Sequence, residues 1–271
     1  MRWFILLVIA AVLAACAKQD EPPTAVLVQF QRASADPVQH GKRVATVLGC
    51  VGCHGGEKLT GDEDFNEPGF GRLWTANLSR AVPTYDDAAL ARVITGGARA
   101  DRTLWGMPSH LFTRLSADDL AAVIAYLRSV PPGGEIHPPP VFEDGARKEI
   151  AAGLWKSSAV EVTEQGAAWP PDAGAEHAQG RYLVRATCAE CHGMNLRGGT
   201  PHPGAKARPD LRLVAAYDAS AFRHLLRTGK AAGEREVSLM SLVARGRYAQ
   251  FTDAEIAAVH AYLGAVAASA P

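Results

Sequence analysis

The chain has 271 residues, of which 48% are hydrophobic, so it is long enough for one large domain or for two small domains with separate cores. Lysine plus arginine and aspartate plus glutamate both count 28, and this balance indicates neither a nucleic-acid partner nor a strongly acidic one. No stretch approaches the ~20 consecutive apolar residues that a membrane-spanning helix needs.

The first sixteen residues have the layout of an export signal. Arg2 precedes an apolar run over residues 3–13, two alanines follow, and Cys16 comes next. The sequence Leu-Ala-Ala-Cys resembles the lipobox of bacterial lipoproteins, in which the cysteine is lipidated and becomes the first residue of the mature chain. The alternative is an ordinary signal peptide that contains a cysteine. We expect residues 1–15 to be a lipoprotein signal peptide. The resemblance implies that Cys16 anchors the protein in the lipid bilayer, on the periplasmic side of a bacterial membrane.

The other four cysteines lie in two copies of one pattern, because residues 50–54 read CVGCH and residues 188–192 read CAECH. The surroundings repeat as well. A Tyr-Asp pair at 85–86 and again at 217–218 begins a predicted helix. Further along each copy, Ser116 and Thr252 are good N-caps, and acidic residues follow in the first turn, where they favour the helix dipole. The chain is therefore an internal duplication.

The final helix of each copy has one apolar face. The positions on this face recur at helical spacing, at 120, 123, 124 and 127 in the first copy and at 256, 259 and 263 in the second. Residues 136–175 are rich in proline and glycine and indicate a connector, with one short helix over 147–156. Since no alternating strand pattern is present, we predict a mostly α fold. Two tandem helical domains, residues 24–135 and 176–271, are joined by that connector.

The repeated Cys-x-x-Cys-His pattern has four possible meanings. A thioredoxin-type site needs a βαβ unit, which the sequence does not indicate. A four-cysteine zinc site usually has its two pairs within about twenty residues of each other, whereas these pairs lie in separate copies. Disulfides across a two-residue gap would gain little loop entropy. The remaining meaning is attachment of c-type heme, for which this pattern is the known sequence sign.

Heme attachment explains the spacing of these residues. Two thiols on one helical turn add across the two vinyl groups of one porphyrin, and the next residue points its imidazole at the iron. The sequence thus predicts two covalently bound heme c groups. Their attachment residues are the cysteines at 50, 53, 188 and 191, and the axial ligands on the attachment side are His54 and His192.

Each iron then requires a sixth ligand, which in electron-transfer cytochromes is commonly methionine. Met107 and Met240 lie at corresponding places, between the helix after Tyr-Asp and the final helix of their copy, and we predict that both bind iron. Met194 is only two residues after His192, so we expect it to fill space in the core. His110 competes with Met107 as a ligand. The remaining histidines, at 40, 137, 177, 202, 224 and 260, are expected to be core or surface residues.

Each copy resembles a class I cytochrome c domain. The matching pieces are Gly-Arg-Tyr-Leu at 180–183, Ala-Asn-Leu-Ser at 76–79, Gly-Met-Pro at 106–108, and Asp118 through the Tyr-Leu-Arg at 126–128. The resemblance implies an N-terminal helix before each motif. It also implies a loop, containing Asn77 or Asp210, whose carbonyls orient the ligating histidine. Arg72, Arg208 and Arg212 are candidates for pairing with heme propionates or for the solvated surface.

The two copies together are similar to the cytochrome subunits of membrane-bound alcohol and gluconate dehydrogenases. Those subunits usually carry three hemes and a helical anchor, whereas this chain has two motifs and a lipobox. The resemblance implies an electron-transfer protein rather than an enzyme. Its partners would be redox proteins: a dehydrogenase subunit, a terminal oxidase or another cytochrome. The alternative is a diheme enzyme, of the peroxidase or thiosulfate dehydrogenase type, with one open or differently ligated iron. A methionine in both copies favours electron transfer.

Overall fold

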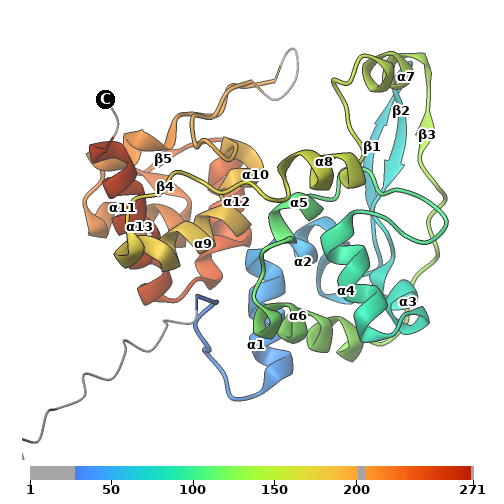
Figure 1. The fold of residues 1–271 in the computed structure, drawn as a ribbon, viewed down its shortest axis with the longest axis horizontal. Helices are drawn as coiled ribbons and strands as arrows, with labels where there is room; N and C mark the ends of the chain where they lie inside the picture. Colours follow the sequence, from blue (N-terminus) through green and yellow to red (C-terminus); the bar gives the residue numbers. More distant parts are fainter. Residues whose placement is uncertain (1–27, 201–204, 270–271) are drawn as a thin grey trace, which may run out of the picture.

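The computed structural model describes residues 28–200 and 205–269, so the signal segment with Cys16 lies outside the described residues. Figure 1 shows two helical lobes side by side, with the N-terminal repeat on the right and the C-terminal repeat on the left. The predicted mostly α fold in two similar lobes is confirmed. No helix in the described ranges has the length and apolar character needed to cross a membrane.

The two lobes follow the same order of helices. Those of the first repeat are α1 (Pro37–Val47), α2 (Cys50–Cys53), α3 (Leu78–Ala81), α4 (Asp87–Gly96), α5 (Ser109–Phe112) and α6 (Ala117–Ser129). Those of the second repeat are α9 (Ala178–Ala186), α10 (Ala189–His192), α11 (Ala219–Thr228), α12 (Leu239–Gly246) and α13 (Asp253–Ala268). Short 3₁₀ turns connect them: η1 (Gly56–Lys58), η2 (Val82–Thr84), η3 (Ala175–His177), η4 (Leu211–Ala216) and η5 (Tyr248–Gln250).

The predicted helix starts are confirmed by their caps. Asp86 and Asp218 cap α4 and α11, and Ser116 accepts a hydrogen bond from the third backbone N–H of α6. Thr252 caps α13 as part of a capping box with Glu255. The predicted apolar faces of α6 and α13 are buried, apart from the half-buried Leu120. Helix α6 ends at Ser129, before the two prolines that cannot continue it.

In each lobe the first helix crosses the last helix at a glycine. A Cβ on Gly41 would lie 1.9 Å from the carbonyl oxygen of Ala122 in α6. A Cβ on Gly180 would lie 2.2 Å from the carbonyl oxygen of Ala258 in α13. Any side chain at either position would overlap the backbone of the other helix. These glycines let the crossing helices approach closely enough to place the attachment segments that follow α1 and α9.

Residues 136–175 contain more structure than the extended connector predicted from composition. They include β3 (Val141–Phe142), α7 (Asp144–Ala151) and α8 (Ser158–Gln165), and α7 begins a little before the predicted helix. Strand β3 pairs with the first repeat, and the backbone N–H of Ser158 donates to the carbonyl of Leu104 at 2.9 Å. The segment therefore packs on the first lobe as far as α8, whereas the carbonyls of Pro170 and Pro171 accept hydrogen bonds from Arg181 and Tyr262 of the second lobe. The sequence shows little apolar periodicity here, because these short elements are largely exposed.

Short strands are present, although the sequence showed no alternating pattern. Strand β1 (Glu63–Glu67) pairs antiparallel with β2 (Gly71–Trp74), and β3 adds to β2. In the second lobe β4 (Lys230–Ala231) pairs with β5 (Arg235–Glu236). Strand β1 has no buried residue, so it lacks the apolar alternation that a half-buried strand shows. Phe65 of β1 and Phe142 of β3 belong to a cluster of aromatic rings. Its other members are Phe70, Trp105 and Trp155.

The two lobes meet through one continuous apolar core and a pair of equivalent buried acids. Asp119 at the start of α6 accepts hydrogen bonds from the N–H of Phe30 and from the hydroxyl of Tyr182 in the other lobe. Glu255 at the start of α13 accepts from the N–H of Gln31 and pairs with Arg43 of the other lobe at 2.8 Å. Each final helix thus begins against the first helix of the other lobe.

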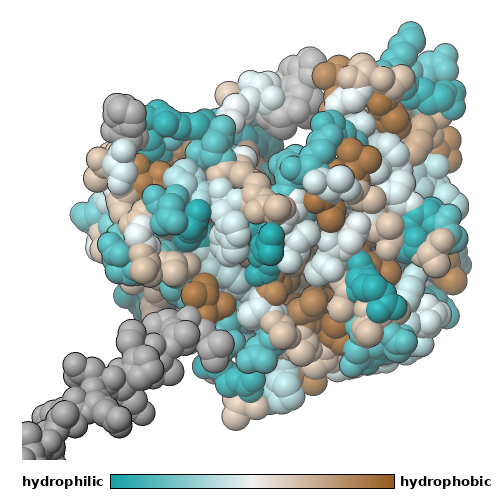
Figure 2. Space-filling model, viewed as in Figure 1, coloured by the Kyte–Doolittle hydropathy of each residue, from teal (hydrophilic) through white to brown (hydrophobic). Residues whose placement is uncertain are grey.

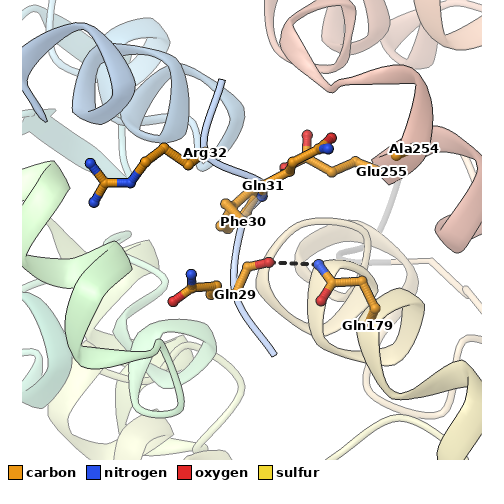
Figure 3. Close-up of a pocket in the computed structure, with 7 residues that line it drawn as sticks. All are labelled: Gln29, Phe30, Gln31, Arg32, Gln179, Ala254 and Glu255. Atoms are coloured by element: carbon orange, nitrogen blue, oxygen red, sulfur yellow. Dashed lines mark hydrogen bonds between the residues drawn. The ribbon is translucent and has the colours of Figure 1, made fainter. Parts of the chain in front are cut away.

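The segment before α1 runs between the lobes. Figure 3 shows Gln29 to Arg32 passing the side chains of Gln179 and Glu255, with the Gln179 side chain donating to the carbonyl of Gln29. A pocket of about 360 Å³ lies against this segment, and none of its lining residues belongs to a Cys-x-x-Cys-His motif. On the face drawn in Figure 2, apolar residues occur in small groups among polar ones.

Candidate heme sites

Each Cys-x-x-Cys-His segment forms one turn of helix directly after the first helix of its lobe, α1 or α9. The N–H of His54 donates to the carbonyl of Cys50 at 3.0 Å, and the N–H of His192 donates to the carbonyl of Cys188 at the same distance. The turn places the two thiols of each motif and the following imidazole on one short, hydrogen-bonded unit. None of the four motif cysteines forms a disulfide with another, so neither motif is a disulfide.

The two histidines make equivalent hydrogen bonds with a loop carbonyl. Nδ1 of His54 donates to the carbonyl of Ala76, and Nδ1 of His192 donates to that of Pro209, both at 2.8 Å. No described residue hydrogen-bonds to Nε2 of either ring. Burial lowers the pKa of both imidazoles, although the carbonyl contact opposes this. A carbonyl oxygen can only accept, so Nδ1 carries a proton in both rings, and in the neutral ring the Nε2 lone pair is available to a metal.

The carbonyl that holds each histidine comes from the loop that the sequence indicated. Ala76 and Pro209 directly precede Asn77 and Asp210, which both cap the following helical turn with their side chains. The Asn77 side chain also donates to the carbonyls of Gly133 and Glu135 at 2.8 Å. These side chains therefore fix the loop, and they act on the histidine only through the backbone carbonyl of that loop.

A strained leucine follows each motif. Leu59 and Leu196 are both fully buried with positive φ angles of 51° and 60°, which leucine rarely adopts. Their carbonyls accept hydrogen bonds from the N–H groups of Ser79 and Leu211, which lie just after the histidine-binding carbonyls. The same hydrogen bond, made by a leucine with positive φ, therefore joins the attachment turn to the carbonyl loop in both lobes, which indicates two copies of one site.

Met107 lies in the loop before α5, and several contacts hold this loop. Trp105 packs on Trp155 at a centroid distance of 5.0 Å, and the N–H of Ser109 donates to the carbonyl of Met107 at 2.8 Å. The connector thus supports the loop through Trp155. Met107 is half-buried and packs against the core of the protein, and its role as an iron ligand stays a prediction.

Met240 occupies the first turn of α12 rather than a loop. The neighbouring Ser241 is buried, donates to the carbonyl of Gly229 at 2.6 Å and accepts from the N–H of Val237 at 2.7 Å. Met240 is half-buried against the core, as Met107 is. Met194 also packs against the core from the turn after α10, in keeping with a space-filling role.

Most of the other candidate side chains already have partners within the protein. Nδ1 of His110 lies 3.6 Å from the carboxylate of Glu161 of α8, which is too far for a hydrogen bond. The paired histidines contact a backbone carbonyl or a glutamate: His137, His177, His224 and His260. His40 is buried in α1, and His202 lies outside the described residues. The three arginines considered for propionates also contact protein groups: Arg72 contacts Glu63, Arg208 a backbone carbonyl, and Arg212 Asp210.

The residues present fit a covalently attached heme better than the other three meanings of the motif. Burial raises the pKa of Cys50 to about 12 and that of Cys188 to about 11, whereas thiols that exchange disulfides have a lowered pKa. Within the described ranges no group of three or more histidine, cysteine or acidic side chains is arranged to hold a metal ion. A heme would instead use two thiols as thioethers and the unpartnered Nε2 of the histidine.

Sequence reasoning missed two arginines that join the lobes at these sites. Arg185 of α9 is buried and donates to the carbonyls of His110 and Leu111, directly after the Met107 loop of the other lobe. Arg247, at the end of α12, pairs with Glu190 inside the second motif. Local patterns gave no signal for these contacts, because the partners of both arginines lie far away in the chain.

The two repeats match the family model for cytochrome c, over residues 38–131 and 177–267. The fructose dehydrogenase cytochrome subunit of Gluconobacter japonicus is 24% identical over 262 residues, which cover 86% of this chain and 53% of that protein. The cytochrome c subunit of the quinone-dependent alcohol dehydrogenase of Gluconacetobacter polyoxogenes is 26% identical over 178 residues, which cover 61% of this chain and 38% of that protein.

The chain therefore spans about half, or less, of the length of these curated relatives. The family match is independent of that difference, because it covers most of the described residues and includes both attachment motifs. It also accounts for the duplicated histidine geometry. The protein belongs to the cytochrome c family, with one family domain in each lobe.

Proposed function

We propose that the protein is a diheme electron-transfer cytochrome, with one covalently bound heme c in each lobe. Bound heme supplies a one-electron ferric/ferrous couple. The observation that carries the proposal is the matched geometry of His54 and His192. In both lobes Nδ1 is held by a loop carbonyl at 2.8 Å, and Nε2 has no partner among the described residues.

In this proposal Met107 and Met240 complete the coordination of the two irons. A thioether on each iron leaves no position for a substrate, so the protein passes electrons and does not catalyse a reaction of its own. The donor is a dehydrogenase or a respiratory-chain component, and the acceptor is a downstream redox protein such as another cytochrome or a terminal oxidase. Support comes from the curated relatives, which are named as cytochrome subunits of fructose and alcohol dehydrogenases.

The number of hemes provides the direct test. The alkaline pyridine spectrum of the purified protein is expected to give two hemes per chain, and the heme should stay on the denatured chain because thioether bonds survive unfolding. Replacing Cys188 and Cys191 together with alanine should leave one heme, and the equivalent change at Cys50 and Cys53 should leave the other. A colourless wild-type chain that binds zinc instead would contradict the proposal.

We further propose that Cys16 carries a lipid that anchors the protein on the periplasmic side of a bacterial membrane. The support is the lipobox-like sequence that ends at this cysteine. Changing Cys16→Ser is expected to move the protein from the membrane fraction into the soluble periplasmic fraction, because the acyl chains supply the hydrophobic anchor. Immunoblots of fractions washed with high salt measure this. A serine variant that stays with the membrane would show that another element anchors it.

A further inference from the structure

The two attachment segments are joined by one side chain, that of Arg247. Its Nε donates to the carbonyl of Val47, at the end of the helix that leads into the first motif, at 3.1 Å. Its Nη1 pairs with the carboxylate of Glu190, which lies between the two cysteines of the second motif, at 2.7 Å. Arg247 therefore holds both attachment segments at once, one by a charge-assisted hydrogen bond to a carbonyl and one by an ion pair.

The first motif is shaped to receive this arginine. Gly49 directly precedes Cys50 and has a φ of 93°, and a Cβ there would lie 2.8 Å from Cζ of Arg247. A residue other than glycine would therefore displace the guanidinium as well as strain the turn. The side chain of Arg247 is only 13% exposed and that of Glu190 only 26%, so solvent screens the pair weakly.

The ion pair lies within electrostatic range of both motifs. Nη1 of Arg247 reaches the Glu190 carboxylate between Cys188 and Cys191, and Nε reaches the carbonyl of Val47, three residues before Cys50. Charges that contact both attachment segments also act on whatever those segments hold.

We propose that the Arg247–Glu190 ion pair is shared by the two heme sites, where it sets both reduction potentials and fixes the contact across which electrons pass between the lobes. This rests on the proposed function. The step is a one-electron exchange: one iron changes from ferrous to ferric while the other changes from ferric to ferrous. No bond forms or breaks, and no proton moves. Arg247 and Glu190 are positioning residues, because neither binds iron.

The two charges of the pair predict shifts of opposite sign. An oxidised heme carries one more positive charge than a reduced heme, so a neighbouring cation favours the reduced state and a neighbouring anion favours the oxidised state. Arg247→Gln should therefore lower both potentials, and Glu190→Gln should raise both. At a fixed ambient potential, the ratio of oxidised to reduced heme should change by about threefold or more, as expected for a poorly screened unit charge.

The experiment is a spectroelectrochemical titration of the two-heme protein and its variants. Arg247→Lys keeps the cation beside Glu190 and is expected to restore both potentials to near the wild-type values. Arg245→Gln is the matched control, because Arg245 lies two residues away, is 41% exposed and pairs with Glu236. It should shift neither heme. Electron redistribution between the lobes after flash photoreduction should slow in Arg247→Gln and stay unchanged in Arg245→Gln.

The outcomes separate this inference from the proposed function. If the wild type carries two reversibly reducible hemes, the proposed function stands whatever the variants do. A shift confined to one heme, or shifts of the same sign in Arg247→Gln and Glu190→Gln, would then overturn the shared ion pair alone. The same holds if Arg247→Lys lowers the potentials as much as Arg247→Gln. Fewer than two hemes in the wild type would overturn both.

Discussion

Replacing Met107 or Met240 with alanine is expected to open one iron to carbon monoxide and to lower the potential of that heme by about 0.1 V or more, a fraction of the ~0.8 V range that axial ligands set. The physical reason is that the thioether favours the ferrous state and fills the sixth position. Reduced wild-type protein should bind little carbon monoxide. Each single variant should bind about one molecule per chain, the double variant about two.

The oxidised protein provides a second measurement of the same ligands. A sulfur–iron bond gives a weak near-infrared band, and each single substitution should remove about half of it if the two sites are equivalent. Met194→Ala is the matched control, because Met194 is also half-buried against the core. It follows His192 by only two residues, which is too close for its side chain to reach the opposite face of a heme that His192 binds. It should keep the whole band and gain no carbon monoxide binding.

The opposite result would favour the enzyme alternative. Suppose that reduced wild-type protein already binds carbon monoxide stoichiometrically at one heme, or turns over peroxide or thiosulfate. One of the two methionines would then not be a ligand. The repeat in which the methionine substitution changes nothing would hold the open iron. His110, beside Glu161 in α8, would be the first residue to test as a replacement ligand in the first lobe.

Asp119→Ala is expected to lower the free energy of unfolding by about 2–5 kcal/mol, because it leaves two buried donors unpaired at roughly 1–3 kcal/mol each. These donors are the N–H of Phe30 and the hydroxyl of Tyr182, and Asp119 itself is only 1% exposed. Since Tyr182 comes from the other lobe, the loss falls on the contact between the lobes. Urea unfolding followed by far-ultraviolet circular dichroism measures it.

The adjacent residue provides the control for this substitution. Asp118 occupies the same first turn of α6 but is exposed, so Asp118→Ala should change stability by no more than about 0.5 kcal/mol. Tyr182→Phe removes one of the two donors and should cost about 1 kcal/mol. Equal stability of the Asp119→Ala and Asp118→Ala proteins would show that the buried carboxylate contributes nothing to the contact between the lobes.

Much of this protein follows from its sequence alone. The attachment motifs, the caps at Ser116 and Thr252 and the apolar faces of the final helices are local patterns, because capping and helical periodicity depend on residues a few positions apart. The duplication added a second, independent reading of each pattern. The resemblance to class I cytochrome c domains implied the carbonyl loops that hold His54 and His192. The methionine ligands stay predictions, since their evidence is position within the repeat.

Only the tertiary structure revealed how the two lobes are joined. Asp119 and Glu255 look like ordinary first-turn acids in the sequence, yet each is buried against the other lobe, where it accepts long-range hydrogen bonds. Likewise, nothing near Arg247 in the chain indicates that it contacts both attachment segments. Such contacts depend on how distant helices pack, and a sequence pattern of short period carries no information about that packing. The sequence therefore determined two Cys-x-x-Cys-His units, and the fold decided that one arginine contacts the segments of both.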